Sequence, residues 1–313
     1  MKKNLQKLFD EYINFCIHSR RLRPTTIRGY KEVFRNFTSL ASHITNPNLI
    51  TAEEMDSFFK RLQTRRRVVG KGDIKVGVRD STIMTYWSRF NTFFGWLEDR
   101  GHLEKNPLPN MRPAEPQYNN KKTLLKSDIE KIIGAIDTHS KTPFLLKRDK
   151  GIIYLLLFSG IRIGELVSLR VMDVDMEKGV LRINGETSKS KKTREIPMNP
   201  TLKMHLEEYL LERKKKKCKT EHFFVSSNFD KKLTTHGFKH LMKRIVELSG
   251  VKCHFHQFRH TFACTLGGQG ISSYKLQKLL GHTDLRMTDR YLRSMGVEDL
   301  RDDIDRFSID NLL

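Results

Sequence analysis

The sequence has few cysteines, no long apolar run and a shortage of acidic side chains. Its four cysteines, Cys16, Cys218, Cys253 and Cys264, form neither a disulfide framework nor a paired C-x-x-C motif, which favours a reducing cytoplasm. The longest apolar run, residues 152–158, is far too short to span a bilayer, so we expect no membrane partner. An H-E-x-x-H motif is also absent, which excludes the zinc-protease signature of that kind.

Acidic side chains number 36 against 58 lysines and arginines, which leaves a net charge of +22. This excess predicts a polyanionic partner, most commonly nucleic acid, because a merely solubilising surface usually mixes charges and has a smaller net value. Hydrophobic residues at 38% and charged residues at 30% are typical of a globular chain. Residues 298–313 are the exception. Six acids against two bases give them a net charge of −4, so we expect this tail to pack on protein.

A chain of 313 residues predicts about two domains. Within residues 1–108, apolar side chains recur at helical spacing in four segments, which predicts a small four-helix domain, and its excess of basic residues favours contact with DNA. The segments are 4–20, 27–40, 55–62 and 83–97. A basic, glycine-containing loop is expected at 65–72, with Arg65, Arg66 and Arg67 as phosphate contacts.

A proline-rich linker is expected at 109–122, because its composition suits a semi-rigid connector. The second domain, 123–296, contains several helical patterns and one hairpin, whose strands are predicted at 180–184 and 195–197. A tail helix is expected within 297–313. The predicted fold class is therefore mainly α with a small antiparallel β-sheet: a helical domain followed by an α+β domain.

The stretch 256–291 gathers side chains that suit nucleophilic attack on a phosphodiester. His256 precedes Arg259 by three residues, and Tyr291 follows His282 by nine. A phenol can carry a phosphate covalently, and a guanidinium grips phosphate oxygens in a planar fork without losing its proton. Imidazoles can move protons near neutral pH.

Two further groups of charged residues lie upstream. Arg162 follows a glycine at the end of an apolar helix, and Glu165 lies three residues on, so both should share one face of a short helix. The hairpin tip carries Lys189, Lys191 and Lys192. Taken alone, the first group would be a surface ion pair and the second a solvated turn.

Together these groups resemble the tyrosine recombinases, the family of Xer proteins, Cre and phage or transposon integrases. The six active-site positions of that family are filled, in order, by Arg162, Lys189, His256, Arg259, His282 and Tyr291. The matching motifs are Ser159-Gly160-Ile161-Arg162-Ile163-Gly164-Glu165-Leu166, Arg194-Glu195-Ile196-Pro197, Phe255-His256-Gln257-Phe258-Arg259-His260-Thr261-Phe262-Ala263, and Leu280-Gly281-His282 with Tyr291. The resemblance covers residues 123–295 and extends more weakly to the N-terminal helices, which look like the family's SAM-like core-binding domain.

The resemblance implies a site-specific DNA recombinase that acts through a 3′-phosphotyrosine and a Holliday junction, as in Xer-type resolution or in the integration and excision of a mobile element. Tyr291 is then the nucleophile and His256 its base partner. Arg162 and Arg259 clamp the non-bridging oxygens, with His282 as a further donor.

The general acid is assigned by counting back from the end of the hairpin. This count places it at Lys189, with Lys191 as the alternative, and leaves Lys192 and Arg194 as flanking phosphate contacts. Glu165 is expected to orient Arg162 and its helix.

The partners that the resemblance implies are double-stranded DNA with paired half-sites and three further copies of the chain. We expect a monomer in solution and a homotetramer on DNA, in which the tail of each protomer reaches a neighbour. No cofactor is expected. ATP is not needed, because the bond energy is kept in the phosphotyrosine, and no catalytic metal is expected, because no carboxylate cluster lies near these motifs.

Three alternatives stay open at this point. A type IB topoisomerase uses similar chemistry to relax DNA, and a DNA-binding protein without catalysis would keep the positive charge alone. A zinc site could be drawn from Cys253, His256, His260 and Cys264, although their spacing lacks the short paired turns of zinc modules. We expect His260 to be a buried structural histidine.

Overall fold

The computed structural model describes residues 4–70, 72–114, 123–186 and 192–292, with backbone alone for 290–292. The chain divides into two units, Met1–Tyr118 and Asn119–Leu313. This division falls within the stretch where the prolines predict a linker. None of the helices in the described ranges combines the length and apolar composition needed to cross a membrane.

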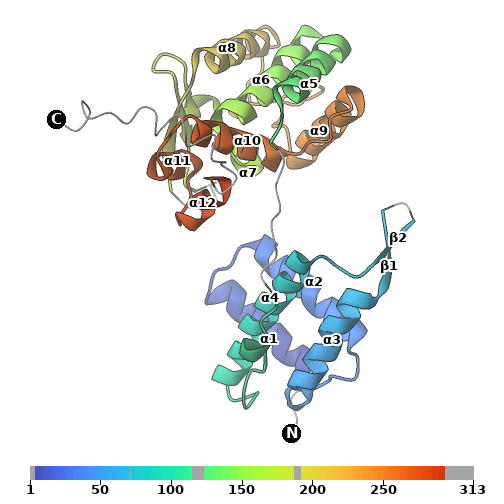
Figure 1. Cartoon of the computed structure of the whole chain (residues 1–313). Coiled ribbons are helices and arrows are strands. Elements are labelled where there is room, and N and C mark those ends of the chain that lie inside the picture. Colours follow the sequence, from blue (N-terminus) through green and yellow to red (C-terminus); the bar gives the residue numbers. More distant parts are fainter. Residues whose placement is uncertain (1–3, 71, 115–122, 187–191, 293–313) are drawn as a thin grey trace, which may run out of the picture. The chain divides into compact units, whose positions relative to one another are not determined.

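Four α-helices build the described part of the first unit (Figure 1). They are α1 Leu5–His18, α2 Pro24–Leu40, α3 Ala52–Thr64 and α4 Asp80–Asp99, with 3-10 turns η1 Pro47–Leu49 and η2 Leu108–Met111. Aromatic rings fill the space between the helices. Phe9 of α1 stacks on Phe34 of α2 with 3.7 Å between ring centroids, and Phe93 of α4 meets Phe9 edge-on at 5.3 Å. The aromatic side chains therefore form the core, as aromatic packing geometry favours.

The loop expected at 65–72 is instead part of a β-hairpin, so that prediction was wrong. β1 Arg66–Val69 pairs antiparallel with β2 Asp73–Val76. β-Branched side chains in both segments favour extended backbone. Gly70 and Gly72, with φ of +61° and +119°, supply the turn between them. The basic, glycine-rich composition masked this pattern.

The second unit surrounds one central helix. Its elements are α5 Lys126–His139, α6 Pro143–Ser159, α7 Ile163–Ser168, η3 Val171–Asp173, β3 Val174–Asp175, β4 Val180–Ile183, β5 Arg194–Pro197, α8 Pro200–Lys215, α9 Thr235–Ser249, α10 Phe255–Gly268, α11 Ser273–Leu280 and α12 Arg286–Leu292. Ile152, Ile153, Leu155 and Leu156 of α6 are all buried, because α5, α8 and α10 pack around that helix.

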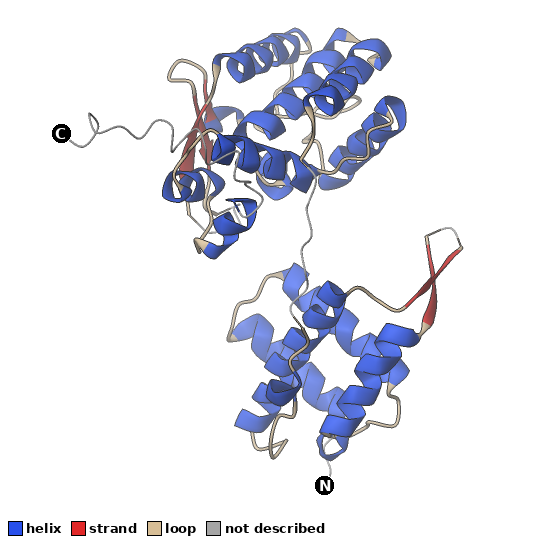
Figure 2. Cartoon of the chain, in the orientation of Figure 1, coloured by secondary structure: helices blue, strands red, loops and turns tan. Residues whose placement is uncertain are grey.

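A three-stranded antiparallel sheet with the order β3-β4-β5 lies in the same unit (Figure 2). β4 and β5 are the two strands expected from the sequence, and Ile183 at the end of β4 lies opposite Arg194 at the start of β5. The hairpin tip, 187–191, lies outside the described residues. The predicted fold class, mainly α with small antiparallel sheets, is confirmed.

Candidate active site

A glycine at the end of α6 brings two parts of the site together. Gly160 has φ of +56°, and a Cβ there would lie 2.4 Å from Cδ1 of Phe262, so only glycine fits. Its carbonyl oxygen accepts a hydrogen bond from Nη1 of Arg259 at 2.7 Å. Arg162 follows two residues later as the N-cap of α7. The end of α6 therefore positions Arg162 and holds Arg259 of α10 beside it.

Glu165 lies at the centre of the cationic cluster and is only 3% exposed. Its carboxylate accepts the backbone N–H of Arg162 at 2.9 Å and Nη1 of the same residue at 3.1 Å. Burial alone would raise the pKa of Glu165, but hydrogen bonds and charge from Arg194 and Arg162 outweigh it and lower the pKa to about 2. Glu165 is therefore an ionised carboxylate that fixes the Arg162 backbone and guanidinium.

The guanidinium of Arg194 is engaged by other protein groups and does not point to a phosphate site. Its Nη1 and Nη2 donate to the two oxygens of Glu165 at 3.0 and 2.8 Å, and its Nε donates to the carbonyl of Leu279 at 2.8 Å. The side chain is 8% exposed. This placement contradicts the expected role, because the guanidinium fork is occupied by a buried carboxylate. Arg194 instead ties β5 to α7 and to the end of α11.

Residues 280–282, at the C-terminal end of α11, bring together the groups expected to bind phosphate. Arg259 donates through Nη2 to the carbonyl of Leu280 at 2.6 Å and to Nε2 of His282 at 2.9 Å. Arg162 donates through Nη2 to the carbonyl of Gly281, which lies between them, at 3.3 Å. Arg259 is buried at 2% exposure, whereas the Arg162 side chain is 20% exposed. Two guanidinium groups and one imidazole therefore meet at 280–282.

The imidazole of His282 is held in one tautomer. Arginine only donates hydrogen bonds, so Nε2 of His282 accepts from Arg259 and the proton of the neutral ring lies on Nδ1. Nδ1 then donates to Oγ1 of Thr288 at 2.9 Å. Burial lowers the pKa of His282 to about 3, helped by the charges of Arg259 and Arg162. His282 is therefore neutral at pH 7 in this arrangement.

Thr288 is a site residue that the sequence reading missed. It is fully buried on α12, and its Oγ1 accepts a hydrogen bond from Nδ1 of His282. Tyr291 follows three residues later in the last turn of α12, so the backbone positions of Thr288 and Tyr291 lie one helical turn apart. In the sequence, only the three-residue spacing between Thr288 and Tyr291 could have pointed to this role for Thr288. The Tyr291 side chain is outside what the structure describes.

The remaining expected residues are less closely gathered. His256 is an exposed residue in the first turn of α10, one turn before Arg259, and its charge contributes to the lowered pKa of His282. Lys192 is exposed beside the hairpin tip. Lys189 and Lys191 lie outside the described residues.

The zinc alternative finds no support in the geometry. Among the described residues, no group of three or more His, Cys, Asp or Glu side chains could hold a metal ion. The Cys253 thiol contacts the sulfur of Met242 at 3.5 Å, and the Cys264 sulfur lies 3.6 Å from Nδ1 of His260. His260 is 5% exposed, as expected of a structural histidine.

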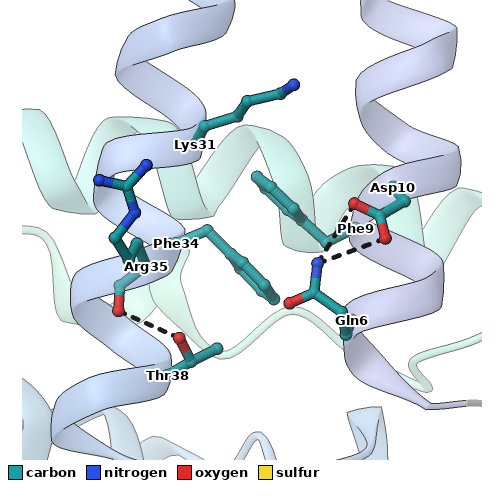
Figure 3. A pocket seen from close by; sticks show the side chains of 7 residues that line it. All are labelled: Gln6, Phe9, Asp10, Lys31, Phe34, Arg35 and Thr38. Atoms are coloured by element: carbon teal, nitrogen blue, oxygen red, sulfur yellow. Dashed lines mark hydrogen bonds between the residues drawn. The ribbon is translucent and has the colours of Figure 1, made fainter.

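The first unit carries exposed cations that the sequence reading also missed. Arg28, Lys31 and Arg35 are exposed on α2, and their spacing of three and four residues puts them on one face. Figure 3 shows Lys31 and Arg35 beside a pocket between α1 and α2, whose wall includes the stacked Phe9 and Phe34. The helical period within 27–40 could have revealed this basic stripe.

Replacing Glu165 with glutamine should lower the free energy of unfolding at pH 7 by about 3 kcal/mol, because an amide cannot balance two partly buried arginines. The folded-state pKa lies below the ordinary 4.5, so this stabilisation is complete above pH 4.5 and is lost as pH falls towards 2. Urea unfolding at pH 7 and pH 3.5 measures both quantities. The difference from the parent protein should be smaller at pH 3.5 by roughly 1 kcal/mol.

The matched control is Glu207→Gln, because Glu207 is exposed and its ion pair with Lys203 spans 3.9 Å. That variant should unfold like the parent protein at both pH values. A Glu165 variant that loses the same stability at pH 3.5 as at pH 7 would contradict an ionised Glu165 at the centre of the cluster.

Known proteins are similar to this chain over most of its length. Residues 122–296 match the model of the phage integrase family. The chain is 30% identical over 298 residues to a tyrosine recombinase of Thermosipho africanus, which covers 92% of this chain and 95% of that protein. It is 28% identical over 295 residues to the tyrosine recombinase XerD of Listeria monocytogenes, with coverages of 92% and 94%.

Solved structures share the fold. The Tn1549 transposon integrase, in complex with a circular intermediate DNA, superposes with a TM-score of 0.75 at 19% identity and covers 96% of this chain and 98% of that one. A lambda integrase dimer bound to a core site gives a TM-score of 0.70 at 19% identity, with coverages of 94% and 79%. Within each unit, the helices and the small sheet therefore have the same fold as in these two integrases.

Proposed function

The chain belongs to the phage integrase family of tyrosine recombinases, and we propose that it is a site-specific DNA recombinase that uses Tyr291 as its nucleophile. The observation that carries the proposal is the convergence of Arg162, Arg259 and His282 at backbone positions 280–282. A phosphodiester under attack concentrates negative charge on its non-bridging oxygens, and fixed cations stabilise that charge.

In the first step, the phenol oxygen of Tyr291 attacks the scissile phosphorus, and the bond from phosphorus to the 5′ oxygen breaks. The phenol proton passes towards His256, because a phenol with a pKa near 10 needs help to ionise. Arg162 is the more exposed arginine and binds the incoming phosphate. Arg259 is already held by two carbonyls and needs no reorganisation.

The leaving 5′ oxygen takes its proton from Lys189, or from Lys191 if the hairpin register differs by two residues. The products are a 3′-phosphotyrosine and a 5′-hydroxyl. That hydroxyl can attack the phosphotyrosine of a partner strand, so strand exchange proceeds through a Holliday junction. The energy of the broken phosphodiester bond is conserved in the phosphotyrosine, so we propose that the reaction needs no ATP. The arginines supply the positive charge at the phosphate, so we also propose that it needs no metal.

Binding of the DNA phosphate should change the protonation state of His282. At pH 7 its Nε2 accepts from Arg259 and has no proton to give. The negative charge of a bound phosphate raises the pKa of a neighbouring imidazole and favours a proton on Nε2. We propose that His282 becomes a donor to the phosphate only in the DNA complex. Arg65, Arg67 and Lys192 remain proposed phosphate contacts, whereas Arg66 shares a hairpin face with three exposed aliphatic side chains and is not proposed as one.

The proposed function is tested by strand exchange between two duplexes of different length. Each duplex carries inverted copies of a sequence that the full-length protein enriches from a random-sequence library, with a spacer of varied length. Recombinant products of the two expected lengths support a recombinase. Relaxation of a supercoiled plasmid without recombinants would indicate a topoisomerase, and binding without any cleavage would indicate a silent DNA-binding protein.

Removing the hydroxyl of Thr288 should slow cleavage without weakening DNA binding. Thr288→Val keeps the shape but removes the hydroxyl that accepts from Nδ1 of His282, which loosens the link from His282 to α12. We expect cleavage of the enriched duplex to fall about 10- to 100-fold, as misplacement of a reacting group does. Single-turnover cleavage and mobility-shift assays measure the two effects.

Thr288→Ser is the matched control, since it keeps the hydroxyl and should keep most of the activity. If the valine variant cleaved as fast as the serine variant, the bond between His282 and Thr288 would have no role in placing Tyr291.

The acidic tail should matter for assembly. We propose that residues 297–313, which lie outside the described residues, form a helix that docks on a neighbouring protomer, so that four chains form a ring on two DNA sites. A chain ending after Ser294 should bind a single site normally but form no tetramer and yield little recombinant. Size measurements on DNA complexes test this, and wild-type levels of tetramer would contradict it.

A further inference from the structure

The β1–β2 hairpin presents an apolar face to water. Cross-strand partners point to the same face, so Val68, Ile74 and Val76 lie together there with Arg66. The three aliphatic side chains are 72%, 69% and 67% exposed. Among the described residues the two strands pair only with each other, and Figure 1 shows them projecting from the helices of their own unit. Such a face gains free energy when a partner covers it.

The hairpin is attached to its unit by defined contacts. The N–H of Gly77 donates to the carbonyl of Arg65 at 2.9 Å, and Nε of Arg67 donates to the carbonyl of Gly77 at 2.7 Å. Gly77 has φ of +66°, and a Cβ there would lie 2.1 Å from the carbonyl oxygen of Gln63, so the chain passes directly against the end of α3. The ribbon is therefore presented in a set direction relative to α3.

Charge selects among possible partners. Segment 65–79 contains six basic residues and one acidic residue, Asp73, for a net charge of +5. The whole chain carries +22, so a second copy would be repelled, whereas a polyanion would be attracted. A partner that is polyanionic outside and offers apolar methyl groups inside a groove fits both features of the hairpin.

We propose that the β1–β2 ribbon enters the major groove of the bound duplex and reads base edges with the face formed by Val68, Ile74, Val76 and Arg66. This proposal rests on the proposed function as a DNA recombinase. The major groove is about 12 Å wide and admits a two-stranded β-ribbon. Aliphatic side chains contact the 5-methyl group of thymine, and an arginine on the same face can donate to guanine O6 and N7.

The opposite face of the ribbon carries cations that can contact the phosphates on either side of the groove. It carries Arg67 and Lys75, which lie opposite each other in the register, beside the pair Val69 and Asp73, so two cations face one acid there. A ribbon with aliphatic side chains towards the bases therefore keeps cations near the phosphates on either side. Phosphate contacts position the protein, while the aliphatic face supplies sequence preference at a few base pairs.

The first test compares sequence selection by two proteins. The full-length chain and its triple variant Val68→Thr, Ile74→Thr, Val76→Thr each enrich duplexes from a random-sequence library. Threonine is β-branched and keeps the hairpin, but it places a hydroxyl on the face. The variant should bind the duplex enriched by the parent about tenfold more weakly. It should also lose sequence preference at one short block of base pairs and keep it elsewhere.

Val69→Thr is the matched control, because Val69 lies on the opposite face of β1. It should enrich the same sequence as the parent protein. A second arm replaces the thymines of the affected block by uracil, which removes only the 5-methyl groups. Uracil should weaken binding by the parent protein and leave binding by the triple variant unchanged.

Two results would overturn the proposal. In one, the triple variant enriches the same sequence with the same affinity and responds equally to uracil. In the other, its DNA binding is unchanged but its association with a second chain on DNA is lost, which would assign the face to a protein contact. A parent protein that binds no duplex would instead remove the proposed function itself, so the two failures are distinguishable.

Discussion

Replacing Tyr291 with phenylalanine should abolish the covalent protein–DNA adduct and leave duplex binding unchanged. Phenylalanine keeps the ring but has no oxygen to attack phosphorus, so the loss should be complete and not partial. The remaining cationic cluster does not depend on that oxygen, because Arg162 and Arg259 are held by backbone carbonyls of residues 160, 280 and 281. A nicked suicide duplex traps the adduct, which SDS gels then display.

Tyr274 offers a matched control. It is 59% exposed on α11, and the Nζ of Lys278 lies 4.6 Å from the centre of its ring. Tyr274→Phe should form the adduct at the parent rate, since its hydroxyl has no part in the proposed chemistry. An SDS-stable, protease-sensitive adduct formed by the Tyr291→Phe variant would show that another residue is the nucleophile.

Lys189→Ala should reduce cleavage of ordinary DNA by about 10² to 10⁴-fold, the usual contribution of a general acid. The alkoxide that leaves from the 5′ side is strongly basic and needs a proton as the bond breaks. A duplex with sulfur in the 5′-bridging position has a thiolate leaving group that needs none. This substrate should therefore restore cleavage to the Lys189 variant.

Lys191→Ala decides between the two lysines of the hairpin tip. If Lys189 is the acid, the Lys191 variant should cleave ordinary DNA at close to the parent rate and gain little from the sulfur substitution. Rescue confined to the Lys191 variant would move the role to Lys191. An absence of rescue in both variants would place the acid outside this hairpin.

The sequence predicted those parts of the fold that depend on local pattern. Glycine and arginine at 160 and 162 marked the end of α6, and the alternation around 180–197 marked β4 and β5. The order of residues within the motifs also identified Arg162, Arg259 and His282, which meet at positions 280–282. The residue order within each motif was sufficient there, although the first motif runs from the end of α6 into α7, and the family resemblance supplied which motifs come together.

The sequence could not show which arginine forms the main ion pair with the buried carboxylate of Glu165. Arg162, three residues away, was the expected partner of Glu165, but Arg194 is 29 positions further along the chain and binds both carboxylate oxygens. The bond from His282 to Thr288 was equally hidden, because threonine on a short helix has no distinctive pattern. Such pairings depend on tertiary packing and are not encoded in helical or strand periodicity.

The most direct measurement of the central claim is the chemical identity of the protein–DNA bond. The adduct trapped on a suicide duplex is digested with trypsin, which cuts after Arg290 and Arg293, and the DNA-linked peptide is sequenced by mass spectrometry. We expect the peptide Tyr291-Leu292-Arg293 joined through tyrosine to a 3′-phosphate, with a free 5′-hydroxyl on the released strand. A different peptide, a 5′-phosphate linkage or cleavage without any linked peptide would contradict it.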